Sequence, residues 1–132
     1  MSKRPTPSNP YGKAAHNYSA TASQQDDTRA TEAKALLKAA KMLQDLQNSW
    51  DGKSQSKVEE TLKYNRQLWV LFYDHAISDG GSKTLNTNVV NLAGFVFKRS
   101  LEILAAPAPE KLNILININR EVANGLMTKK QS

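Results

Sequence analysis

The sequence predicts an all-α protein, a small bundle of about four helices with a disordered N-terminal arm. Apolar residues recur at intervals of three and four over four segments, which is the spacing of one helical face. Turn residues or proline separate these segments, and the first 26 residues contain very few large apolar groups. A chain of 132 residues is long enough for one domain with a modest core, so we expect a single domain.

The N-terminal segment differs in composition from the rest of the chain. Residues 1–26 contain three prolines and many small polar residues, with Tyr11 and Tyr18 as the large apolar groups. Such a composition buries too little area to offset the entropy lost on ordering. We therefore interpret residues 1–26 as a flexible basic arm, 27–127 as a helical domain and 128–132 as a flexible basic tail.

The first helix is expected over about 28–50. Its apolar face contains six residues: Ala33, Leu36, Ala40, Leu43, Leu46 and Trp50. The sequence DGKSQ at 51–55 is typical of a turn. Ser56 and Glu59 follow at the spacing of a capping box, in which the hydroxyl and the carboxylate bind free amides at a helix start. A second helix is expected over about 57–77.

The second helix carries two apolar stripes. The first is the expected core face: Val58, Leu62, Asn65, Trp69, Phe72 and Ala76. The second lies about a third of a turn away: Tyr64, Leu68, Leu71 and His75. A helix that is apolar over so wide an arc is either central in its domain or partly covered by a partner. Both interpretations stay open at this point.

Two further helices complete the predicted bundle. SDGGSK at 78–83 breaks the chain, and a helix is expected over about 86–105. Pro107 ends it, whereas Pro109 suits the first turn of a fourth helix over about 109–126 because its missing amide would be unpaired there. Helical geometry separates the residues of LININREVANGL at 115–126 into an apolar and a polar face, whereas strand alternation fails from Arg120.

Two asparagines lie on predicted apolar faces, Asn65 on the second helix and Asn119 on the fourth. A buried amide without a partner costs about 1–3 kcal/mol. We therefore predict a structural polar core in which these two side chains bond to each other, to backbone, or to an arginine such as Arg66. The alternative is a groove that faces a partner.

The residues for catalysis or metal binding are few. Cysteine is absent, which excludes disulfides and thiolate metal sites, and the two histidines are His16 and His75. Asp74 and His75 are adjacent, so their side chains diverge by about 100° on a helix. No EF-hand spacing or phosphate-binding loop is present. We expect no enzyme activity, no metal and no cofactor.

The net charge of +6 comes from the chain ends. Lys3, Arg4, Lys13, Lys129 and Lys130 account for the excess, and the remainder of the chain is near neutral. No recognition helix or aromatic platform accompanies the basic residues, so nucleic acid is not the expected partner. No apolar run is long enough to span a membrane or to form a secretory signal. We expect a cytoplasmic protein without a membrane partner.

Several stretches, taken in order, resemble the flagellar biosynthesis regulator FlaF family: TRATEAKALLKAA at 28–40, YNRQLWVLF at 64–72, NLAGFV at 91–96, PAPEKL at 107–112 and LININREVANGL at 115–126. The resemblance covers about residues 11–126. It implies a helical cytoplasmic protein that promotes flagellin synthesis and secretion during assembly of a bacterial-type flagellum, as a flagellin-binding export chaperone. The resemblance also implies that the protein acts together with, or in opposition to, the translational regulator FlbT.

The broad apolar arc of the second helix and this resemblance suggest one mechanism. Our hypothesis is that a helical apolar segment of flagellin lies in a groove of the bundle. The candidate partner-binding residues are Tyr64, Arg66, Leu68, Trp69, Leu71 and Arg120, with the two arginines at the rim. The alternative is a post-transcriptional regulator that binds flagellin mRNA directly through its basic arms.

Overall fold

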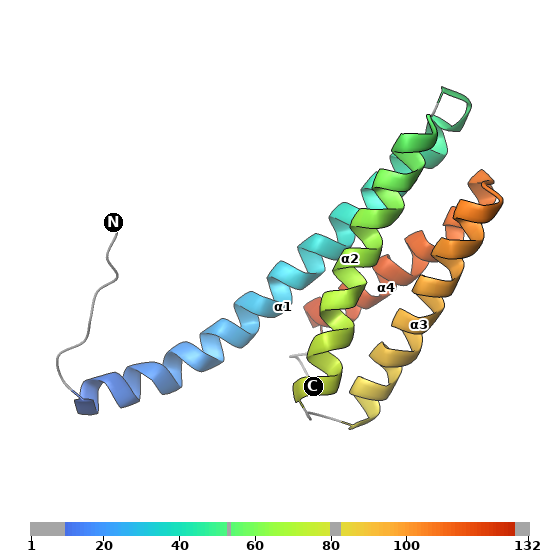
Figure 1. The fold of residues 1–132 in the computed structure, drawn as a ribbon. Helices are drawn as coiled ribbons and strands as arrows, with labels where there is room; N and C mark the ends of the chain where they lie inside the picture. Colours follow the sequence, from blue (N-terminus) through green and yellow to red (C-terminus); the bar gives the residue numbers. More distant parts are fainter. Residues whose placement is uncertain (1–9, 53, 80–82, 129–132) are drawn as a thin grey trace.

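The computed structural model describes the backbone of residues 10–52, 54–79 and 83–128, and the side chains of 28–52, 54–78 and 88–128. Within these residues the chain forms four α-helices and no strand, so the predicted all-α class is confirmed (Figure 1). The helices are α1 Pro10–Asn48, α2 Gln55–Asp79, α3 Lys83–Ala105 and α4 Asn113–Thr128. Two short 3-10 segments lie at Trp50–Gly52 and Pro109–Leu112.

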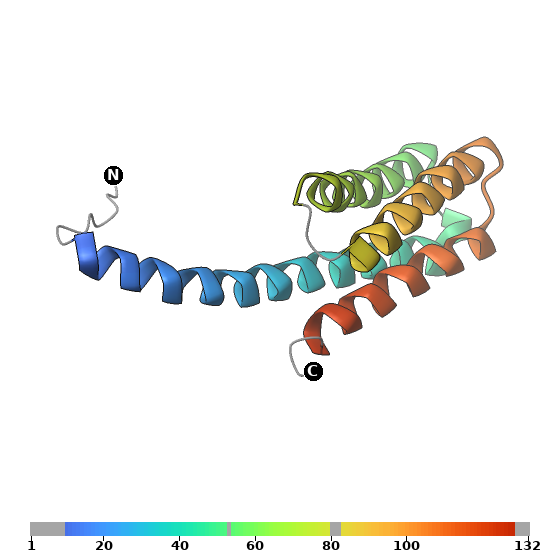
Figure 2. The ribbon, with the colours of Figure 1, turned by 90° about the horizontal axis from the view of Figure 1, so that it is seen from below.

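The helices form two layers. The helix pair α1 and α4 makes one layer and the pair α2 and α3 makes the other (Figure 2). In addition α1 packs beside α2, whereas α3 and α4 approach each other least closely of the neighbouring helices. Chain order around the bundle is therefore α1, α2, α3, α4.

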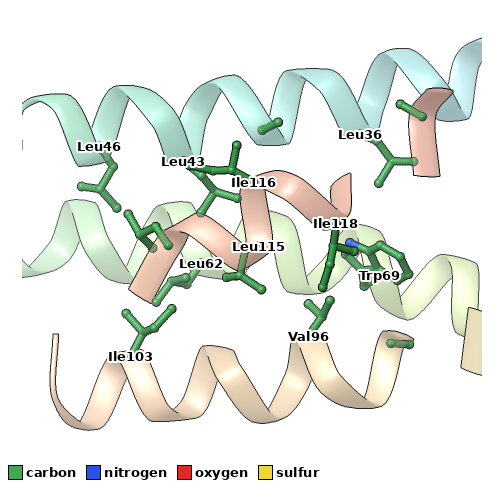
Figure 3. Close-up of a cluster of buried hydrophobic side chains, with 14 of the residues drawn as sticks. Leu36, Leu43, Leu46, Leu62, Trp69, Val96, Ile103, Leu115, Ile116 and Ile118 are labelled. Atoms are coloured by element: carbon green, nitrogen blue, oxygen red, sulfur yellow. The ribbon is translucent and has the colours of Figure 1, made fainter. Parts of the chain in front are cut away.

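All four helices contribute side chains to one core (Figure 3). The apolar residues predicted on the first helix are buried between Ala33 and Leu46, together with Ala39. The predicted core stripe of α2 is also buried, apart from Phe72, which is half-buried. The other two helices complete the core with Ala93, Val96 and Ile103 from α3, and Leu115, Ile116, Ile118 and Ala123 from α4.

The start of α1 differs from the prediction. The helix begins at Pro10 rather than near residue 28, and its first turns extend beyond the other helices (Figures 1 and 2). The composition of this segment argues against burial. It does not prevent a helix, because helical hydrogen bonds form within the segment itself. Proline also suits a first helical position. Of the predicted arm (1–26) and tail (128–132), residues 1–9 and 129–132 lie outside the described residues.

Two local details also differ from the expected helix starts. Ser54, not Ser56, caps α2: its Oγ accepts a hydrogen bond from the backbone N–H of Lys57 at 3.1 Å. Pro109 begins a 3-10 segment rather than α4 itself. At this end of the bundle Gln47 Nε2 donates to the Pro109 carbonyl at 2.8 Å and to Asn113 Oδ1 at 2.7 Å. These bonds connect the end of α1 to the start of α4.

Candidate partner-binding surface

A buried polar network connects α2 to α4. Asn65 and Asn119 are both fully buried. The Nδ2 of Asn119 donates to Oδ1 of Asn65 at 2.7 Å, and the indole Nε1–H of Trp69 donates to Oδ1 of Asn119 at 2.9 Å. The two amides thus bond to each other, which is one of the three arrangements that the sequence left open. The Nδ2 of Asn65 is left without a hydrogen-bond partner among the described residues.

This network fixes the relative position of two helices that are not neighbours around the bundle. Because the Trp69 indole can only donate, it orients the Asn119 carbonyl oxygen towards itself and the Asn119 amide nitrogen towards Asn65. A shift of α4 by one residue along α2 would break both bonds. The network is therefore a determinant of helix register, and its members do not reach the surface.

The second stripe of α2 lies along the flank of α1. The Nζ of Lys38 on α1 lies 5.4 Å from the centre of the Tyr64 ring, and Nδ1 of His75 lies 3.7 Å from Oε2 of Glu32 on α1. Leu68 and Leu71 fall between Tyr64 and His75 on the same helical face. We call this set the α1/α2 surface: Tyr64, Leu68, Leu71, Lys38, Glu32 and His75.

Exposure increases along this surface. Tyr64 and Leu68 are half-buried, and Leu68 also packs against the core. Leu71, which lies further along the same helix, is 56% exposed. The surface thus has an apolar centre, with a cation at one end and a carboxylate–imidazole pair at the other.

Three of the sequence-predicted binding residues do not lie on this surface. Trp69 is fully buried, so the prediction that it contacts a partner is wrong for this folded state. Arg66 is 200° around α2 from both Tyr64 and Leu68, on the flank that faces α3. Arg120 is exposed on α4, which packs against α1 rather than on the α2 flank. The two arginines therefore do not form the rim of a groove around Tyr64, Leu68 and Leu71.

A second apolar surface lies on the outer side of α2 and α3, and the sequence-based reasoning missed it. The rings of Tyr73 on α2 and Phe97 on α3 meet edge to face with their centres 6.3 Å apart. Val70 and Ile77 lie about one turn before and after Tyr73 on α2, and Leu101 lies about one turn after Phe97 on α3. They are 41%, 57% and 63% exposed. We call these five residues the α2/α3 face. The stripe spacing of Val70, Tyr73 and Ile77 was a signal for it, since these residues repeat at three and four.

The described residues offer little for metal chemistry or membrane insertion. Among their side chains, no group of three or more histidines, cysteines or acidic residues lies close enough to hold a metal ion. Over the same part of the chain, none of the helices combines the length and the apolar character needed to cross a bilayer.

Comparison with known proteins assigns the family. A family model described as "Flagellar protein FlaF" matches residues 14–126, which include the core of all four helices. Searches of curated proteins and of solved structures gave no match. The match covers most of the chain, and the stretches that first suggested the family all lie within it. The chain therefore belongs to the FlaF family of flagellar proteins.

Proposed function

We propose that this FlaF-family protein binds flagellin as an export chaperone and thereby promotes flagellin synthesis and secretion. The observation that carries the proposal is the α1/α2 surface, with Leu71 exposed at the end of the apolar strip that lies nearer His75. A free apolar strip of this kind on a small protein marks a site for another polypeptide. Membership of a flagellar family makes the subunit of the flagellar filament the natural candidate.

The geometry favours an amphipathic helix as the bound segment. Tyr64, Leu68 and Leu71 lie on one face and span seven residue steps, which is about 10 Å or two helical turns. A helix that presents apolar residues at i, i+3 or i+4 and i+7 matches this length. Lys38 at one end and Glu32 with His75 at the other would fix the direction of the bound helix, because opposite charges lie at its two ends.

Binding of purified flagellin tests the proposal. Leu71→Asp replaces the most exposed apolar residue of the strip by a charge, so we expect flagellin affinity to fall at least about tenfold. The matched control is Leu101→Asp, a leucine of similar exposure on a different flank, which should bind flagellin normally. Far-UV circular dichroism checks that both variants stay helical. Equal binding by Leu71→Asp and the unmodified protein would remove the α1/α2 surface from consideration.

A further inference from the structure

The α2/α3 face exposes apolar side chains from two neighbouring helices. Tyr73 and Phe97 meet across the two helices, and α2 and α3 lie antiparallel side by side (Figure 1). Val70 is about one turn before Tyr73 and Leu101 about one turn after Phe97, so these two residues lie at the same level. Ile77 extends the strip one turn in the other direction. The exposed apolar groups are thus contiguous rather than scattered.

The charges beside this strip are self-complementary. Arg66 and Asp74 lie four residues before and four residues after Val70, on the same row of α2. Among the described side chains, neither takes part in an ion pair. When a helix packs antiparallel against its own copy, residues at equal distances from the centre face each other. With Val70 at the centre, each Arg66 faces Asp74 of the second copy.

We propose that the α2/α3 face pairs with the same face of a second copy of this chain about a two-fold axis near Val70. The interface is isologous, so each contact occurs twice. Val70 and Leu101 meet their own copies at the centre, and two Arg66–Asp74 pairs lie at the sides. Long-range repulsion between the copies is weak, since outside its basic ends the chain is almost neutral. This inference does not depend on flagellin binding, because the α1/α2 surface is on the other flank of α2.

Sedimentation equilibrium of the full chain, over about 1–200 µM, tests the pairing. We expect a monomer–dimer equilibrium for the unmodified protein. Leu101→Asp introduces two charges at the centre of the interface, so the dissociation constant should rise about 100-fold. Leu71→Asp is the control and should dimerise normally. A monomer throughout this range, or a dimer that Leu101→Asp leaves unchanged, would overturn the proposal.

Charge reversal tests the two-fold arrangement itself. In Arg66→Asp, the new aspartate faces Asp74 of the second copy at both sides of the axis. In Asp74→Arg, the new arginine faces Arg66 of the second copy in the same way. Each variant alone should therefore dimerise roughly tenfold more weakly. An equimolar mixture of the two variants restores both opposite-charge pairs and should recover the dimer. A mixture that dimerises no better than its components would disprove the predicted axis. Loss of flagellin binding in Leu101→Asp, with dimerisation unchanged, would instead assign this face to flagellin.

Discussion

The buried amides of Asn65 and Asn119 can each be replaced by leucine, which has the same number of side-chain heavy atoms. Whether Asn65→Leu lowers or raises the free energy of unfolding should depend on whether Asn119 is still present. Asn119→Leu leaves the Trp69 indole N–H and the Asn65 carbonyl oxygen without partners. Each such buried group costs about 1–3 kcal/mol, so the variant should lose about 2–6 kcal/mol of unfolding free energy. A domain of this size has a total of about 5–15 kcal/mol, so this loss is large.

Asn65→Leu should behave differently. In the unmodified protein this change leaves only the Asn119 amide nitrogen without its hydrogen-bond partner. It also removes the Asn65 Nδ2, which has no partner among the described residues. The loss of unfolding free energy should therefore be smaller than for Asn119→Leu. In the Asn119→Leu background it removes a stranded amide altogether. There it should stabilise the protein by about 1–3 kcal/mol.

Urea denaturation followed by far-UV circular dichroism measures these differences in unfolding free energy. The midpoint urea concentration reports them, provided that the dependence of the free energy on urea concentration stays the same. Ser100→Ala serves as the control. The Ser100 hydroxyl bonds to the carbonyl of Val96 on its own helix, so its removal strands no group on another helix and should cost less than about 1 kcal/mol. If Asn65→Leu destabilises the protein equally in both backgrounds, the two amides do not form the bonded unit described above.

Three further outcomes are expected. Leu43→Ala should cost about 2–5 kcal/mol in urea denaturation because it leaves a cavity in the core, whereas Leu37→Ala, at a site 38% exposed, should cost less than about 1 kcal/mol; similar costs would contradict the core assignment. Gly125→Ala should raise the thermal midpoint by an amount corresponding to about 0.5–1 kcal/mol, because a Cβ there meets open space on α4; a lower midpoint would mean that the site is crowded. Deletion of residues 1–24 should leave flagellin binding intact in a pull-down, because the α1/α2 surface begins at Glu32; loss of a salt-dependent RNA affinity in the same variant would support the mRNA-binding alternative.

The residues that face the core could largely be predicted from the sequence. The spacing of Leu36, Leu43 and Leu62 follows helical periodicity, and periodicity depends only on local geometry. The same geometry put Asn65 and Asn119 on apolar faces, which are buried in the structure. Burial of a polar side chain requires a partner, so chemistry predicted that each amide is bonded, but it left open whether the partner is the other amide, backbone or an arginine.

The surfaces were harder to predict, because they depend on which helix lies beside which flank. Arg66 and Arg120 are both polar residues next to apolar stripes, and periodicity alone does not say which neighbouring helix each one faces. Trp69 lies on the core stripe and beside the second stripe, so its burial was decided by the packing of α4 over it. The α2/α3 face requires the pairing of α2 with α3, which only the assembled bundle shows.

The pairing of the first helix with the last has a consequence for synthesis. Among the described helices, α1 packs most extensively against α4, which the ribosome makes last. Until residues 113–128 have emerged from the ribosome, one side of the core is missing. The apolar side chains of the nascent polypeptide that α4 would cover stay exposed to solvent. A product that stops before this point cannot close its core, so proteases and chaperones would meet it in an open form.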